Sequence, residues 1–173
     1  LTHFGLSGPA VLDVSRHWLL ARRQASDVEL RVRWLPGETE RSLDVALRAL
    51  GSSTVREWLR ERLPARLGDA LAELAGVHPE TRGDALTRDA RRAVVRTLDA
   101  LVLPVTGDRG WAYAEVTAGG VPLGEVRLDG LASRVCEGLH LCGEILDVDG
   151  RIGGFNFQWA WASGTSAGRG AAR

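Results

Sequence analysis

The most informative segment of this chain is Leu139-His-Leu-Cys-Gly-Glu-Ile-Leu-Asp-Val-Asp-Gly-Arg-Ile-Gly-Gly-Phe-Asn156. It runs from a short apolar stretch through several carboxylates and paired glycines into the start of an apolar helix. A helix start presents free backbone N–H groups and a partial positive charge, which stabilise negative charge on a ligand. Gly153 and Gly154 would let a flat ring approach those groups, and Glu144 is suited to accept hydrogen bonds from sugar hydroxyls. The same pattern is common in surface turns, so a ligand site and a plain turn both remain open.

Upstream of this segment, the spacing of apolar residues predicts mostly helices. A proline after Ser-Gly, followed by spaced apolar residues, predicts a helix over 9–22. Residues 27–35 alternate apolar and charged side chains, as a half-buried strand does. Apolar residues three and four apart predict a subdomain of about four helices over 38–101, in which Thr54 and Glu57 form a capping box.

Glycine becomes frequent after residue 104, and the predicted elements become short. We expect β-type runs at 113–117 and 138–142, and a final helix over 155–167. Small residues on that helix would allow a close approach to a sheet or a cofactor: Ala160, Ala162, Ser163, Gly164 and Ala167. Trp159 and Trp161 point to different faces of a helix, so at least one of them is expected to lie in the core.

Charge and hydropathy favour a protein that binds neither nucleic acid nor membrane. The 22 basic and 22 acidic residues cancel, so no long-range field would attract a polyanion. The basic cluster of Arg88, Arg91, Arg92 and Arg96 is therefore expected to be a solvated helix face. No apolar run approaches the roughly 20 residues that span a bilayer, and we expect a cytoplasmic location. The chain begins at Leu1 and holds no methionine, so we expect a piece of a longer protein.

The residues that could bind metal or act as nucleophiles are scattered. Cys136 and Cys142 are too few for a disulfide framework and lack zinc-site spacing, so we expect two semi-buried thiols. The histidines are His3, His17, His78 and His140. They form no i, i+4 pair, and we predict no metal site. His3 either faces a substrate or packs locally, and no residue is assigned as a catalytic acid or base.

Three motifs carry a resemblance to a known family. The run from Cys142 to Gly164 closely resembles the C-terminal signature of the BaiN-like bacterial flavoproteins, which are NAD(P)/FAD-dependent oxidoreductases related to aminoacetone oxidase. The stretches 1–10 and 116–121, the latter followed by Glu125-Val126, fit the same family. The motifs are in order and span the whole chain, which makes the resemblance specific.

The resemblance implies an α/β fold, with α+β character for these residues in isolation. Residues 1–116, including the helical subdomain at 38–101, would end an inserted domain with β-barrel and helical parts. Residues 117–173 would be the C-terminal part of a glutathione-reductase-like FAD-binding domain. The preceding dinucleotide-binding half, with its G-x-G-x-x-G fingerprint, is absent from these residues, so we expect that they do not bind FAD stably without it.

The resemblance also implies where FAD would bind. Glu144, after Gly143, would contact the ribityl or pyrophosphate region. Backbone N–H groups at the pyrimidine edge of the flavin would come from Gly153, Gly154, Phe155 and Asn156. The loop that holds Gly119 and Gly120 would lie close to the isoalloxazine ring.

The function implied is hydride transfer between a small organic substrate and flavin, with NAD(P) or O₂ as redox partner. The alternative is a truncated interaction domain, built around 38–101, that binds no flavin and catalyses nothing. A third possibility, nucleic-acid binding by the arginine cluster, is disfavoured by the zero net charge. The sequence predicts no oligomeric state.

Overall fold

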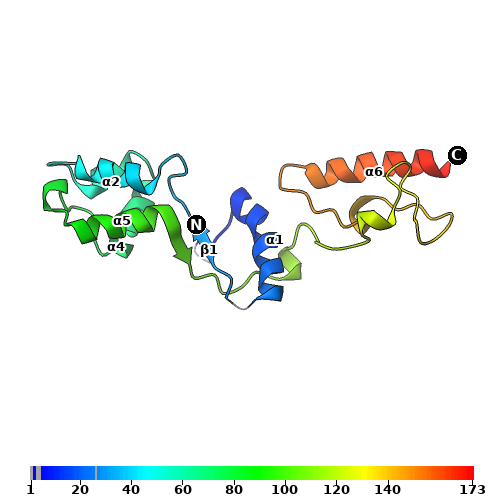
Figure 1. The fold of residues 1–173 in the computed structure, drawn as a ribbon, viewed down its shortest axis with the longest axis horizontal. Helices are drawn as coiled ribbons and strands as arrows, with labels where there is room; N and C mark the ends of the chain where they lie inside the picture. The colour runs from blue at the N-terminus through cyan, green and yellow to red at the C-terminus, as the bar shows by residue number, and fades with distance from the viewer. Residues whose placement is uncertain (1, 3–4, 26) are drawn as a thin grey trace. The chain divides into compact units, whose positions relative to one another are not determined.

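The computed structural model describes residues 2, 5–25 and 27–173. Its contacts divide the chain into two compact units (Figure 1). The terminal unit combines residues 1–28 with 106–173, and the helical unit comprises residues 29–105. The predicted boundary at 116 concerns the domains of a longer protein, and it stays a prediction.

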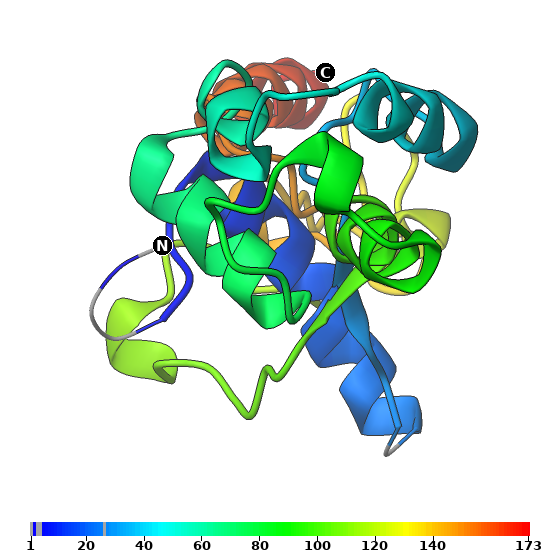
Figure 2. The ribbon, with the colours of Figure 1, turned by 90° about the vertical axis from the view of Figure 1, so that its left-hand side faces the viewer.

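The helical unit contains a cluster of helices and a two-stranded antiparallel sheet that contacts α5 (Figure 2). Its elements are β1 (Leu30–Val32), α2 (Glu40–Arg48), α3 (Val55–Arg60), α4 (Ala65–Leu74), the 3₁₀ turn η1 (Gly83–Ala85), α5 (Arg88–Ala100) and β2 (Leu101–Leu103). In the sheet, Leu30 pairs with Leu103 and Val32 with Leu101. The strand predicted over 27–35 is thus correct in type but shorter, because it has only three residues of partner strand.

Local capping explains where these helices begin. Thr54 accepts a hydrogen bond from the backbone N–H of Glu57, and the Glu57 side chain reaches back to the backbone of Thr54, which confirms the predicted capping box. Thr39 and Ser42 form a second box at the start of α2. The core of the unit is formed by buried apolar residues: Leu43, Leu47, Val55, Trp58, Leu59, Leu71, Ala72, Val77, Leu86, Val94, Val95 and Leu98.

The terminal unit holds two long helices and several short turns. They are α1 (Pro9–Gln24), η2 (Trp111–Tyr113), η3 (Leu123–Glu125), η4 (Gly143–Ile145) and α6 (Phe155–Ala171). The helices predicted at 9–22 and 155–167 are confirmed. The β-type runs predicted at 113–117 and 138–142 are wrong: the first overlaps the 3₁₀ turn η2, and the second contributes a single bridge from His140 to Ala132. A ladder needs a partner strand, and these runs have none among the described residues.

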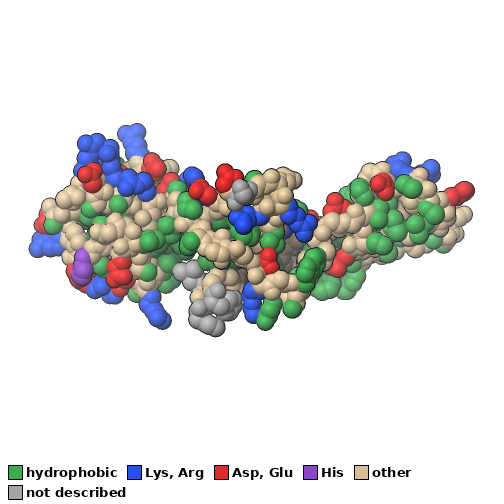
Figure 3. All heavy atoms as spheres, turned by 90° about the horizontal axis from the view of Figure 1, so that it is seen from below, with side chains coloured by type: hydrophobic (Ala, Val, Ile, Leu, Met, Phe, Trp, Pro, Cys, Tyr) green, Lys and Arg blue, Asp and Glu red, His purple; other side chains and the backbone are tan. Residues whose placement is uncertain are grey.

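The core of the terminal unit is small. It consists of Val126, Leu131, Leu146 and Ala167, with Trp159 packed beside them. Trp159 therefore packs on the core, as expected for one of the two tryptophans, while Trp161 is 75% exposed. Figure 3 shows many hydrophobic side chains on the surface of the C-terminal segment at its right-hand end. The unit leaves much of its apolar surface uncovered.

The described residues show a mixed helix and sheet composition. Within the described residues, the sheet has only two strands. The inserted β-barrel therefore stays a prediction. Among the same residues, no helix combines the length and apolar character needed to cross a bilayer.

Candidate functional site

The start of α6 carries backbone donors that nothing in the described chain satisfies. Its N-cap is Gly154, in the left-handed conformation with φ of 85°, and no side chain caps the helix. Gly153 precedes it with φ of 115°. None of the backbone N–H groups of Phe155, Asn156 and Phe157 has an acceptor among the described residues. Helix ends normally find caps, so this open end can accept a negatively polarised group from a ligand.

The turn before α6 is closed by Asn156. Its side-chain oxygen accepts a hydrogen bond from the N–H of Gly150 at 2.6 Å, and its amide nitrogen donates to the carbonyl of Gly150 at 3.0 Å. Arg151 lies over the ring of Phe155, with 4.9 Å between the guanidinium carbon and the ring centroid. The Asn156 side chain therefore holds the turn in place, and its backbone N–H stays free.

Helix α1 also anchors this turn, by contacts that the sequence analysis missed. The Asp13 carboxylate accepts a hydrogen bond from the N–H of Ile152 at 2.6 Å. Arg16 pairs with the Asp149 carboxylate at 3.2 Å and also donates to the Asp149 carbonyl. Asp13 and Arg16 lie three apart on the predicted helix, but no local signal links them to residues more than 130 positions away.

The second predicted group, Gly143 and Glu144, is held against α6. Gly143 donates its N–H to the Ser163 hydroxyl at 2.9 Å, and its carbonyl accepts from the Trp159 indole at 3.1 Å. Gly143 has φ of 74°, which favours glycine. Glu144 is exposed, and its carboxylate has no partner among the described residues. It is free to accept hydrogen bonds from a ligand.

The third group, Gly119 and Gly120, lies against the segment that follows Gly143. Val121 donates to the carbonyl of Ile145 at 2.8 Å, and Asp147 donates to the carbonyl of Val121 at 2.9 Å. A Cβ on Gly120 would lie 2.5 Å from the oxygen of Ile145, so only glycine fits there. The fold thus brings two of the three predicted groups side by side. It shows no hydrogen bond from either of them to the 153–156 turn within the described residues.

Residues 17–170 match the family described as HI0933-like protein Rossmann domain. The chain belongs to this family. The resemblance to the BaiN-like flavoproteins, on which the three motifs agreed, is thereby confirmed. The Rossmann description also agrees with the predicted α/β class.

The relatives of this HI0933-like chain include enzymes of two different names, a reductase and a dihydrouridine synthase. It is 35% identical to the 3-dehydro-bile acid delta(4,6)-reductase of Clostridium scindens, over 99% of the chain and 43% of the relative. It is 35% and 32% identical to the ribosomal RNA dihydrouridine synthases of Escherichia coli and Haemophilus influenzae, over 94% of the chain and 39% of each relative. The chain therefore spans about two fifths of the length of the curated relatives it matches.

The other candidate groups, as far as the structure describes them, form no second site. Cys136 and Cys142 are free, but both are exposed, and the expectation of semi-buried thiols is wrong. Val135 and Leu139, apolar residues near them in the chain, are themselves 77% and 41% exposed. His140 contacts the carbonyl of Gly130 at 2.7 Å, and His3 lies outside the described residues. No set of three metal-ligating side chains lies together among the described residues.

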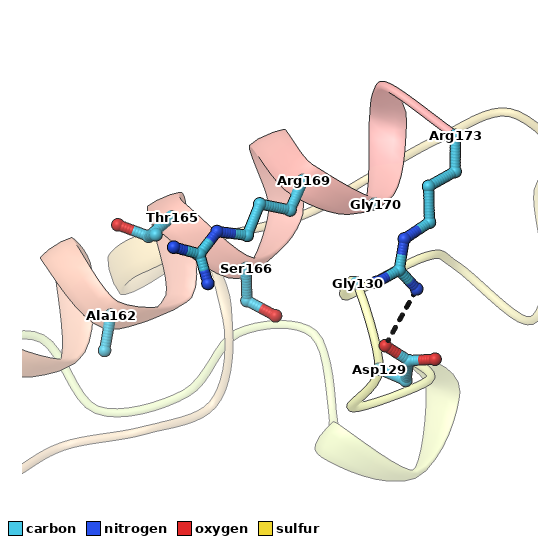
Figure 4. Close-up of a pocket in the computed structure, with 8 residues that line it drawn as sticks. All are labelled: Asp129, Gly130, Ala162, Thr165, Ser166, Arg169, Gly170 and Arg173. Atoms are coloured by element: carbon cyan, nitrogen blue, oxygen red, sulfur yellow. Dashed lines mark ion pairs between the residues drawn. The ribbon is translucent and has the colours of Figure 1, made fainter.

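A polar hollow of about 230 Å³ lies beside the C-terminal half of α6 (Figure 4). It is lined by Asp129, Gly130, Ala162, Thr165, Ser166, Arg169, Gly170 and Arg173. Arg173 pairs with Asp129 at 3.5 Å across it. None of the predicted flavin-site residues lines the hollow, so it is separate from the candidate site.

Proposed function

We propose that this chain is the C-terminal part of an FAD-dependent oxidoreductase. The observation that supports this most directly is the uncapped start of α6, where Gly153 and Gly154 precede a turn of unsatisfied backbone donors. A flavin presents carbonyl oxygens at its pyrimidine edge, and such donors match them in chemistry. No side chain at either glycine would obstruct the ring.

The other predicted residues fit the same cofactor. The free carboxylate of Glu144, after Gly143, is suited to the hydroxyls of the ribityl or ribose groups. The Gly119 and Gly120 loop would lie near the isoalloxazine ring. FAD supplies the hydride chemistry when bound, and the chain supplies its position and electrostatics. The free N–H groups of α6 would stabilise negative charge on the reduced ring and so adjust its potential.

We propose an N-terminal dinucleotide-binding half as the partner of the terminal unit. The chain spans about two fifths of its relatives, and the phosphate-binding fingerprint is absent from its residues. Phe157 and Trp161 share one face of α6 and are 74% and 75% exposed. Burying two aromatic side chains of this size would stabilise such an assembly by several kcal/mol, at about 1.5–3 kcal/mol for each side chain.

The substrate class proposed first is a small organic compound with a carbon–carbon double bond conjugated to a carbonyl. The names of the relatives denote a reductase and an enzyme that forms dihydrouridine, and both reactions add hydrogen across a double bond. In this direction NAD(P)H is oxidised to NAD(P)⁺, and the substrate gains a hydride and a proton. We propose a cytoplasmic location for this reaction.

A second candidate substrate is a uridine base within RNA. It is favoured by the two dihydrouridine synthases, which are 35% and 32% identical to this chain, against 35% for the bile-acid reductase. The uracil ring holds the same conjugated arrangement of double bond and carbonyl. A non-catalytic interaction domain without flavin is not favoured, because the family match covers the flavin-site segment itself.

The visible absorption spectrum of the full-length protein, purified with its upstream half, tests the proposal. We expect the bands of an oxidised flavin, and their loss in a Gly153→Val/Gly154→Val double variant that still folds. The control is Gly164→Ala/Gly168→Ala on the same helix, where an added Cβ meets nothing within 4 Å. A full-length protein that stays colourless after FAD is added would refute the proposal.

A further inference from the structure

Most arginines of the helical unit lie in ion pairs with nearby carboxylates. The paired ones are Arg31, Arg33, Arg48, Arg56, Arg60, Arg62, Arg82 and Arg91. Three arginines of α5 are different: Arg88, Arg92 and Arg96 are exposed, and none has an ion-pair partner among the described residues. We call these three the α5 arginine row. Two further arginines of the helical unit, Arg41 on α2 and Arg66 on α4, also form no ion pair with a described residue.

The row occupies one line along the helix surface. Its members are spaced four residues apart, which places them on one face at intervals of about 6 Å along the helix axis. Of the two carboxylates on α5, Asp99 pairs with Arg33 at 2.7 Å. Asp89, three positions before Arg92, forms no ion pair with any described residue, so one exposed carboxylate stands against three exposed arginines. The zero net charge of the chain therefore conceals a local excess of positive charge.

This arrangement works against the stability of α5 itself. Like charges four residues apart destabilise a helix, and a cation in the first turn opposes the helix dipole. Arg88 occupies that first turn. An anionic partner that runs along the row would remove both penalties.

The helix that carries the row is anchored to the core of the helical unit. Val94 and Leu98 on the opposite face, and Val95 beside the row, are buried in the core of the unit. Arg91 pairs with Asp44 of α2 at 2.6 Å, which ties the helix to its neighbour. Thr87 caps the start of α5 through the N–H of Ala90. The backbone that carries the row is therefore anchored to the rest of the helical unit.

We propose that the α5 arginine row binds the sugar–phosphate backbone of an RNA substrate. The inference rests on the proposed function, in its form with a uridine substrate in RNA. Guanidinium groups bind phosphate with two parallel hydrogen bonds, and a regular line of them suits a regular line of phosphates. Such contacts position an RNA without reading its sequence.

An anionic membrane fits the row less well. Helices that lie on a bilayer insert large apolar side chains beside their basic residues. The exposed residues of α5 are Arg88, Asp89, Arg92, Arg96 and Ala100. No large apolar side chain accompanies the row, so RNA is the partner that its chemistry favours.

The test is binding of a labelled single-stranded oligouridine RNA, of about 20 nucleotides, followed by fluorescence anisotropy over a series of salt concentrations. Three forms of the protein are compared: the unmodified protein, Arg88→Gln/Arg92→Gln/Arg96→Gln, and a control with the same charge change. The control is Arg31→Gln/Arg48→Gln/Arg82→Gln, three exposed arginines that already have carboxylate partners. Circular dichroism establishes that each variant folds, and the single variant Arg92→Gln provides a milder second case.

We expect the row variant to bind the RNA at least about tenfold more weakly than the unmodified protein. Because three phosphate contacts are lost, the slope of the logarithm of the binding constant against the logarithm of the salt concentration should become shallower by about two. The control should stay within about twofold. Equal losses in row variant and control, or no RNA binding by the unmodified protein at low salt, would overturn the inference. So would retention on phosphatidylglycerol vesicles without binding of RNA. The flavin spectrum of the full-length protein is read separately, so a negative RNA result leaves the proposed oxidoreductase function standing.

Discussion

Ser163 and Gly143 are joined by a hydrogen bond of 2.9 Å between the Ser163 hydroxyl and the backbone N–H of Gly143. Ser163 is 2% exposed and in turn donates to the carbonyl of Trp159 at 2.6 Å. The carbonyl of Gly143 accepts from the Trp159 indole. The proposed contact point of Glu144 is thus set by two side chains of α6, although the helix begins eleven residues later in the chain.

Replacing Ser163 by alanine should lower the free energy of unfolding by about 1–3 kcal/mol, because the N–H of Gly143 loses its acceptor. Chemical denaturation followed by circular dichroism measures the change. Ser166→Ala is the matched control, since the Ser166 hydroxyl has no hydrogen bond to any described residue. Equal stability of the two variants would show that the Ser163 contact contributes nothing.

Gly120 and Gly119 should respond differently to alanine. Both have positive φ, of 136° and 100°, so both variants carry backbone strain of about 1 kcal/mol. Only at Gly120 would the new Cβ also lie 2.5 Å from the carbonyl oxygen of Ile145. We expect Gly120→Ala to unfold at a clearly lower denaturant concentration than Gly119→Ala. If the two midpoints coincide, the close approach of 119–121 to 145–147 does not exist in solution.

Gly170 and Gly168 offer the same kind of comparison on α6. A Cβ on Gly170 would lie 2.6 Å from the Cα of Gly130, whereas one on Gly168 meets nothing within 4 Å. Gly170→Ala should therefore destabilise the terminal unit. Gly168→Ala should stabilise it by about 0.5–1 kcal/mol, the usual gain of alanine over glycine inside a helix. Thermal unfolding of the two variants checks both signs, and stabilisation by both would contradict the packing of α6 on the Gly130 turn.

Asp44 should make the helical unit less stable in acid. The hydrogen bond from Arg91 holds the pKa of Asp44 below its ordinary value of 3.8, and the nearby charges of Arg48 and Arg91 add to the effect. A lowered folded-state pKa gives stability that is present above the unfolded pKa and is lost as pH falls through the folded one. The stability difference between the unmodified protein and Asp44→Asn should therefore be largest near neutral pH and vanish below the folded pKa. Denaturation midpoints at a series of pH values measure it, and a difference that does not change with pH would contradict it.

Asp69 provides a second carboxylate with the same pH dependence. Its partial burial raises its pKa, but the hydrogen bond and charge of Arg56, together with Arg60, outweigh burial and lower the pKa overall. Because both carboxylates shift in the same direction, a double variant with asparagine at Asp44 and Asp69 should show a flatter stability profile below neutral pH than either single variant.

The sequence by itself determined the features that depend on neighbours along the chain. The helix from Pro9 and the helix from Phe155 follow from apolar spacing and from the residues that begin them. The Thr54 capping box involves residues three apart. The glycine pair at 153 and 154 was predicted to precede a helix, and it does so in the structure. These features form within one or two turns of chain, so local patterns were sufficient to predict them.

Only the tertiary structure decided what holds the candidate site in place. Asp13 contacts Ile152, Ser163 contacts Gly143, and Gly130 packs on Gly170, each across a gap in sequence that no local pattern bridges. The same holds for the short runs at 113–117 and 138–142, whose β-type residues form no strand because no partner strand lies beside them. The sequence contains the arginines of the α5 arginine row at a spacing of four residues. It does not predict that they lack ion pairs with described residues, because ion pairing depends on which carboxylates the fold brings close to them.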